Sequence, residues 1–172
     1  MSKNMQNRRW MQKKSASKLP VAAKNTFRLA IEKVDDIKSA YRNGLQALVK
    51  ADLDKIKVKE ARKIEGSVDI DTGTRKLYPN DARWDYVISY AGLAYFVEVH
   101  PATNGEVKTM MAKKQWLQNW LKQKATALNE YPSAKPRFYW IQSGKCGLLK
   151  TSPEYKQAAQ TGLLPRVGLS LG

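Results

Sequence analysis

Apolar residues in the first third of the chain recur at helical spacing. They are Phe27, Ile31, Val34, Tyr41, Leu45 and Leu48, which follow one another at steps of three, four and seven residues. With Pro20 as a helix opener, this spacing predicts one amphipathic helix over residues 21–50. Residues 51–64 mix acidic and apolar residues with lysines, and we interpret them as a second helix or a continuation of the first.

The next segments alternate in the manner of strands. Residues 67–71 predict a short strand whose polar face carries Asp69 and Asp71, most simply as a solvated edge. In residues 83–100, two runs rich in aromatic and β-branched residues flank Ala91-Gly92, which predicts a β-hairpin.

The hairpin register decides which side chains meet. With Ala91 and Gly92 as the loop, Asp85 lies opposite Glu98, and alternation puts His100 on the same face. Opposed carboxylates about 4.5–5.5 Å apart at Cβ favour a positive group between them, and a divalent cation is the obvious candidate. A one-residue slip in the loop would break this pairing.

The rest of the chain predicts a crossover. Apolar spacing predicts a helix over 106–130, followed by a strand over 137–142, a helix that Ser152 caps, and a last short strand over 167–171. The order of elements indicates a single mixed α/β domain in which an antiparallel meander feeds a crossover helix.

Charge indicates the class of partner. The 172 residues include 31 Lys and Arg against 15 Asp and Glu, a net charge of +16. We expect a basic, flexible arm over 1–19 and one folded domain over 20–172. A strongly basic protein favours nucleic acid, and no apolar run is long enough to span a membrane. The lone Cys146 cannot form an intrachain disulfide, which agrees with the cytoplasm.

Most catalytic signatures are excluded by composition. Ser143-Gly144-Lys145 lacks the first glycine of a phosphate-binding loop, and one Cys with one His does not make a zinc site. No glycine-flanked serine accompanies the histidine as in a hydrolase triad. What remains is a set of hard oxygen ligands for Mg²⁺ or Mn²⁺, namely Asp85, Glu98 and a backbone carbonyl such as that of Val99. Such an ion can activate water and polarise a phosphoryl oxygen. Together with His100 beside it and the basic surface, it indicates phosphodiester hydrolysis.

The spacing of Asp85 and Glu98-Val99-His100 around a hairpin resembles the PD-(D/E)XK, or restriction-endonuclease-like, nuclease superfamily. The resemblance covers about residues 21–142 and implies an αβββαβ core. It implies that Asp85 and Glu98 bind the metal and that His100 occupies the position of the family's lysine.

Because His100 stands where the family has lysine, the positive charge of that lysine has to come from elsewhere, and the predicted crossover helix contains candidates. Lys108 or Lys113 there can supply a displaced positive charge, and we assign Lys108 a catalytic role. The resemblance also implies an acidic residue on the first helix, for which Glu60 and Glu65 are the candidates.

Three functions agree with these features. The first is a metal-dependent nuclease that acts on nucleic acid, with DNA favoured over RNA. The second is a nucleic-acid-binding module that keeps the nuclease fold without cleavage. The third is a subunit that docks on a protein partner, with a homodimer also possible. The residues expected to contact nucleic acid are Arg8, Arg9, Lys13, Lys14, Lys113 and Lys114.

Overall fold

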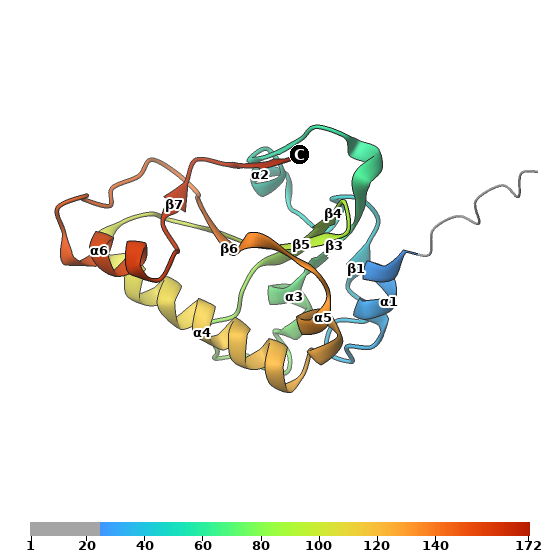
Figure 1. Cartoon of the computed structure of the whole chain (residues 1–172). Helices are drawn as coiled ribbons and strands as arrows, with labels where there is room; N and C mark the ends of the chain where they lie inside the picture. Colours follow the sequence, from blue (N-terminus) through green and yellow to red (C-terminus); the bar gives the residue numbers. More distant parts are fainter. Residues whose placement is uncertain (1–24) are drawn as a thin grey trace, which may run out of the picture.

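A six-stranded mixed sheet runs through the middle of the protein (Figure 1). The computed structural model describes residues 25–172. The arm expected over 1–19, with Arg8, Arg9, Lys13 and Lys14, therefore lies outside the described residues.

The elements follow one another in mixed α/β order. They are α1 (Thr26–Glu32), β1 (Tyr41–Arg42), α2 (Lys50–Leu53), β2 (Ile56–Val58), η1 (Ala61–Lys63), β3 (Ile64–Asp69), α3 (Ile70–Thr74), β4 (Tyr86–Tyr90), β5 (Leu93–His100), η2 (Asn104–Glu106), α4 (Val107–Gln123), α5 (Thr126–Glu130), β6 (Ser133–Gln142), α6 (Pro153–Gln160), β7 (Pro165–Arg166) and β8 (Leu169–Leu171). The sheet order is β1-β3-β4-β5-β6-β7. Neighbours from β1 to β5 are antiparallel, and β5, β6 and β7 are parallel.

Each face of the sheet buries its own hydrophobic cluster. Val87 and Phe96 face α1 and α4 in one cluster. Ile88 and Val97 face the opposite way, toward the small β2–β8 sheet. Figure 1 shows α4 along one side of the sheet, with α2 and the C-terminal segment on the other. Among residues 25–172, no helix combines the length and apolarity needed to cross a membrane.

The hairpin of β4 and β5 has the predicted register. Tyr90 pairs with Leu93 and Tyr86 with Val97. Ala91 and Gly92 form the loop with φ values of 51° and 77°, the left-handed conformations that a tight hairpin turn requires. The predicted register of the hairpin is confirmed, and it makes Asp85 and Glu98 the next pair beyond Tyr86 and Val97.

The prediction of a single helix over residues 21–50 is wrong. Between residues 25 and 49, α1 is the only helix. The chain then makes successive turns in which Val34 N donates to Ile31 O, Ile37 N to Val34 O, and Ala40 N to Ile37 O. Each turn advances three residues, so Ile31, Val34 and Ile37 reach the core at the spacing that a helix would give. Successive turns therefore give the same spacing of buried apolar residues as a helix.

Other boundaries differ for local reasons. Residues 51–64 hold α2, β2 and η1 instead of one helix, and the strand predicted over 67–71 ends at Asp69. There the Asp69 carboxylate accepts from Thr72 N at 2.8 Å and caps α3. The helix predicted over 106–130 breaks between α4 and α5, where Lys124 N and Ala125 N both donate to Trp120 O. The crossover from β5 through α4 to the parallel strand β6 is as predicted.

Candidate functional site

Two carboxylates meet where β4 begins and β5 ends. Asp85 N donates to Glu98 Oε2 at 2.9 Å, and Val99 N donates to Asp85 Oδ2 at 2.9 Å. Each carboxylate is therefore held by a backbone amide of the other strand. The Asp85 side chain is 23% exposed and that of Glu98 is 1% exposed, so the pair opens to solvent on the Asp85 side.

Lys113 of α4 reaches the same place. Met110 and Leu117 of this helix are buried, and residues three or four positions apart share a helix face, so Lys113 also points toward the sheet. Its Nζ lies 2.6 Å from Glu98 Oε1 and 3.9 Å from Asp85 Oδ1, and it donates to Arg83 O at 2.7 Å. One cation thus faces two carboxylates.

Burial controls the charge of this pair. Desolvation raises the pKa of Asp85 to about 6, against the opposing effect of Lys113. Desolvation and the charge of Asp85 together raise the pKa of Glu98 to about 8. In both carboxyls, burial disfavours the charged form more than Lys113 favours it.

His100 connects the pair to a third carboxylate. Its Nδ1 lies 3.7 Å from Glu98 Oε1, and its Nε2 lies 2.8 Å from Glu106 Oε2. The hydrogen bond with His100 lowers the pKa of Glu106. Glu106 was not predicted as a site residue, because the sequence does not show that the chain after Pro101 turns back to the imidazole.

Asp85 and Glu98 each have one carboxylate oxygen that a divalent cation would use. Asp85 Oδ1 forms no hydrogen bond within residues 25–172, and Glu98 Oε1 is buried without one, although Lys113 is its ion-pair partner. Val99 belongs to the site through its amide. No group of three or more His, Cys, Asp or Glu residues in the described chain is arranged around a common ion position. Backbone oxygen and water would therefore have to complete the coordination that Mg²⁺ or Mn²⁺ requires.

The other predicted residues lie apart from this centre. Lys108 is exposed in the first turn of α4 and makes no hydrogen bond or ion pair within residues 25–172. Lys114 Nζ donates to Thr161 O at 2.7 Å, toward the end of α6. Glu60 pairs with Lys63 and Arg62. Glu65 accepts from Tyr131 and from Gly92 N at the loop end of the hairpin.

Asp71 is the acidic residue that the structure brings close instead. Its carboxylate binds Arg83 Nε at 2.8 Å, and its backbone N donates to Asp85 O at 3.3 Å. Its charge contributes to the raised pKa of Asp85. The sequence pattern indicated a solvated strand edge here, because the turn from β3 into α3 has no signature apart from the cap at Asp69.

No known protein family, curated protein or solved structure matches this chain.

Proposed function

We propose that this protein is a metal-dependent nuclease that hydrolyses phosphodiester bonds of nucleic acid, with DNA favoured over RNA. The observation that carries the proposal is the contact of Asp85, Glu98 and Lys113 at the end of the β4–β5 hairpin. Two carboxylates with raised pKa values beside a single lysine form a site suited to a divalent cation. The net charge of +16 supports a polyanionic substrate.

Each residue then has a defined task. Asp85 and Glu98 would hold the cation, and the Val99 carbonyl would be the third ligand. When bound, Mg²⁺ or Mn²⁺ would supply polarisation of the phosphoryl oxygen and a more acidic water molecule. Lys113 offers its ammonium to the phosphate as negative charge develops in the transition state. His100, which Glu106 orients through Nε2, holds the attacking water.

This assignment agrees with the resemblance to PD-(D/E)XK nucleases. The antiparallel strands β3, β4 and β5, the crossover helix α4 and the parallel strand β6 follow the order that the resemblance implies. In this interpretation Lys113, from the helix, supplies the charge that is missing at His100. The αβββαβ core and membership of this superfamily are part of the proposal.

One observation favours a second function, a nucleic-acid-binding module without cleavage. Lys113 Nζ lies 2.6 Å from Glu98 Oε1, where a cation would otherwise bind. If the ammonium stays there, the pair remains an internal ion pair and the protein binds nucleic acid through its positive charge alone.

Cleavage of labelled duplex DNA, single-stranded DNA and RNA in Mg²⁺, Mn²⁺ or chelator distinguishes these functions. We expect metal-dependent cleavage of DNA that falls by about 100-fold or more in Asp85→Asn, Glu98→Gln and Lys113→Met, because each change removes several kcal/mol of transition-state stabilisation. Lys108→Met and Glu60→Gln are the matched controls, since both side chains lie outside the centre. If the protein binds nucleic acid but cleaves it with neither metal, the nuclease is rejected and the binding module remains. Loss in Lys108→Met alone would assign the catalytic lysine to that position.

A further inference from the structure

A small cavity with aromatic walls lies along α4, one helical turn beyond Lys113. Its walls include atoms of Tyr78, Trp116 and Trp120. Its volume is about 230 Å³, below the range of about 300–1,000 Å³ for pockets that enclose a drug-sized molecule. The cavity therefore suits one small planar group.

The three aromatic rings are held in place through their polar atoms. Trp116 Nε1 donates to Asp81 Oδ2 at 3.0 Å, and Tyr78 OH and Trp120 Nε1 both donate to Asp36 Oδ2 at 2.9 Å. The two indoles stack with their centroids 5.7 Å apart, and Tyr78 meets Trp116 in a T-shaped contact, also at 5.7 Å. Because the polar atoms are already engaged, these residues offer a ligand preorganised aromatic surface, on which any nucleic-acid base can pack.

The rim of the cavity has hydrogen-bonding groups and no net charge. Asn119 Oδ1 accepts from Gln115 Nε2 at 3.0 Å. Within residues 25–172, neither Asn119 Nδ2 nor the Gln123 amide has a partner, and amides of this kind can bond the edges of bases. The charged side chains in the lining are Asp81 and Lys124, one of each sign. This balance suits a neutral base better than a phosphate or an organic cation.

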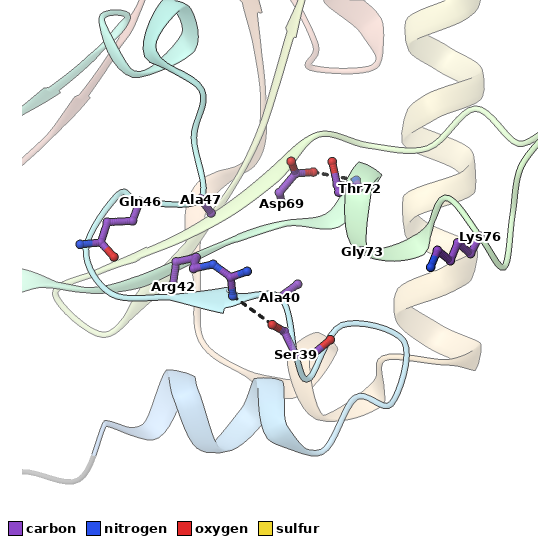
Figure 2. Close-up of a pocket in the computed structure, with 9 residues that line it drawn as sticks. All are labelled: Ser39, Ala40, Arg42, Gln46, Ala47, Asp69, Thr72, Gly73 and Lys76. Carbon is purple, nitrogen blue, oxygen red and sulfur yellow. Dashed lines mark hydrogen bonds between the residues drawn. The ribbon is translucent and has the colours of Figure 1, made fainter.

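The cavity lies on the same side of the sheet as Glu98. Alternation puts Glu98 on the strand face of Phe96, which packs with Trp120 in one hydrophobic cluster. Figure 2 shows a larger cavity, of about 420 Å³, without aromatic residues in its lining. Its Asp69 pairs with Tyr86, which belongs to the cluster on the opposite face. Of these two cavities, the aromatic one is therefore on the side of the carboxylate centre.

The aromatic cavity is also joined to the centre by direct contacts. Lys113, Trp116 and Trp120 share one face of α4, and the span from Lys113 to Trp120 is about 10 Å along the helix axis. The loop before β4 touches both places. Arg83 O accepts from Lys113 Nζ, Arg83 N donates to Asp81 O, and Asp81 accepts from Trp116.

We propose that this cavity holds an unpaired base of the nucleic acid whose phosphate lies at the carboxylate centre. The base packs against Trp116 and Tyr78, and Asn119 and Gln123 bond its edge. A base inside a duplex has to leave the stack before it can enter such a pocket. The inference rests on the proposed function, and it narrows the substrate to single-stranded nucleic acid or to a duplex with an unpaired nucleotide beside the cleaved bond.

Binding of two labelled strands to the full chain, measured by fluorescence anisotropy in chelator, tests the cavity without cleavage. One strand is a short oligodeoxyadenylate, and the other is a base-free sugar-phosphate strand of the same length and charge. The ratio of the two affinities reports contacts with bases, whereas a loss of folded protein lowers both affinities equally. We expect the wild type to prefer the strand with bases.

Trp116→Leu should lower this ratio about tenfold, the size expected for one lost base–aromatic stack. The slope of log K against log salt should stay the same, because no phosphate contact is lost. Tyr95→Leu is the matched control and should keep the wild-type ratio. Tyr95 is also half-buried and packs on another ring, that of Tyr139, but it lies with the cluster on the opposite face of the sheet.

A second variant covers the case in which Trp116→Leu does not fold. Asn119→Ala/Gln123→Ala changes two exposed residues of α4, and it should lower the ratio about threefold through lost hydrogen bonds. Gln46→Ala, an exposed amide in the cavity of Figure 2, is its control and should leave the ratio unchanged.

Three results would overturn the proposal. The first is a wild type without preference for bases, and the second is an unchanged ratio in both cavity variants. The third is binding of a lysine-rich peptide that weakens in Trp116→Leu while the ratio stays constant, which would assign the cavity to a protein partner.

The outcome is independent of catalysis. Cleavage that depends on Glu98, combined with an unchanged ratio in the cavity variants, would keep the nuclease and reject the base pocket. A lowered ratio in the cavity variants, without cleavage in any metal, would keep the base pocket as a strand-binding site and reject the nuclease.

Discussion

Glu98 is the residue on which the carboxylate centre depends most. Its side chain is 1% exposed and lies against Asp85, another carboxylate, and Lys113 Nζ lies 2.6 Å from its Oε1. Burial and the neighbouring negative charge raise its pKa to about 8, and burial raises that of Asp85 to about 6. Without a bound cation, the folded protein therefore retains protons that the unfolded chain releases near pH 4.

This proton retention makes stability depend on pH. Because both pKa values are raised on folding, the stabilising contribution is fully present below about pH 4 and is lost as the pH rises through 6 and 8. We expect the free energy of unfolding in chelator to fall by a few kcal/mol, in order of magnitude, between pH 5 and 8. Glu98→Gln, which cannot ionise, should flatten most of this change. Urea denaturation at pH 5, 6.5 and 8 measures it.

Glu60→Gln is the control for that experiment, because Glu60 lies on the surface beside Lys63 and Arg62. Its pKa is lowered by those partners, so the variant should keep the wild-type pH dependence at these three pH values. Addition of Mn²⁺ at pH 8 should restore stability to the wild type and not to Glu98→Gln. Parallel pH profiles for Glu98→Gln and the wild type would show that Glu98 is not the group that titrates.

At the scale of elements, the β4–β5 hairpin sets the position of both carboxylates. Its loop residues, Ala91 and Gly92, have φ values of 51° and 77°. Glycine adopts this conformation without strain, whereas alanine is strained by its Cβ. A Cβ added at Gly92 meets open space, since nothing lies within 4 Å of its position. Backbone conformation therefore decides the effect of substitutions here.

We expect Ala91→Gly to stabilise the protein by about 0.5–1 kcal/mol and Gly92→Ala to destabilise it by about 1 kcal/mol. Urea denaturation of the two variants at one pH measures both. Gly144→Ala serves as control, because this exposed glycine also meets open space but has no positive φ. A stabilising Gly92→Ala would mean that the loop does not have the left-handed conformation.

The elements also show why some of the fold was predictable and some was not. The hairpin was predictable because its alternation and its loop residues lie within one short segment. The helix over 21–50 was wrong because the turns at Val34 and Ile37 bury apolar residues at the same three-residue step. Sequence periodicity reports which residues are buried, and it does not distinguish a helix from turns of equal step.

At the scale of the whole molecule, the candidate site also has a part that the sequence predicts and a part that it does not. Asp85, Glu98 and His100 belong to one hairpin, so local pattern brought them together. Lys113 comes from α4, and Glu106 from the turn before it. Their approach depends on how α4 lies across the sheet, which no local pattern specifies. The sequence offered Lys108 and Lys113 as alternatives, and the structure brings Lys113 to the carboxylates.

Charge is distributed unevenly along the whole chain. Seven of the 31 basic residues precede residue 25, and none of the 15 acidic residues does. The remaining 24 basic residues share residues 25–172 with all 15 acidic ones, and several of them are paired on the surface. Exposed ion pairs contribute little to stability, but a paired cation releases fewer counterions when it meets a phosphate. The first segment should therefore contribute more to the salt dependence of binding than its length suggests.

Replacing Arg8, Arg9, Lys13 and Lys14 with Gln tests this contribution. If all four contact phosphates, the slope of log K against log salt for duplex DNA should fall by about 3.6, since each contact contributes about 0.9. The matched control replaces Arg28, Lys38, Arg62 and Arg75, which already lie beside carboxylates, and we expect it to change the slope by less than half as much. Titrations in chelator at several salt concentrations give both slopes. Equal changes would mean that only net charge matters and that the first segment has no special part in binding.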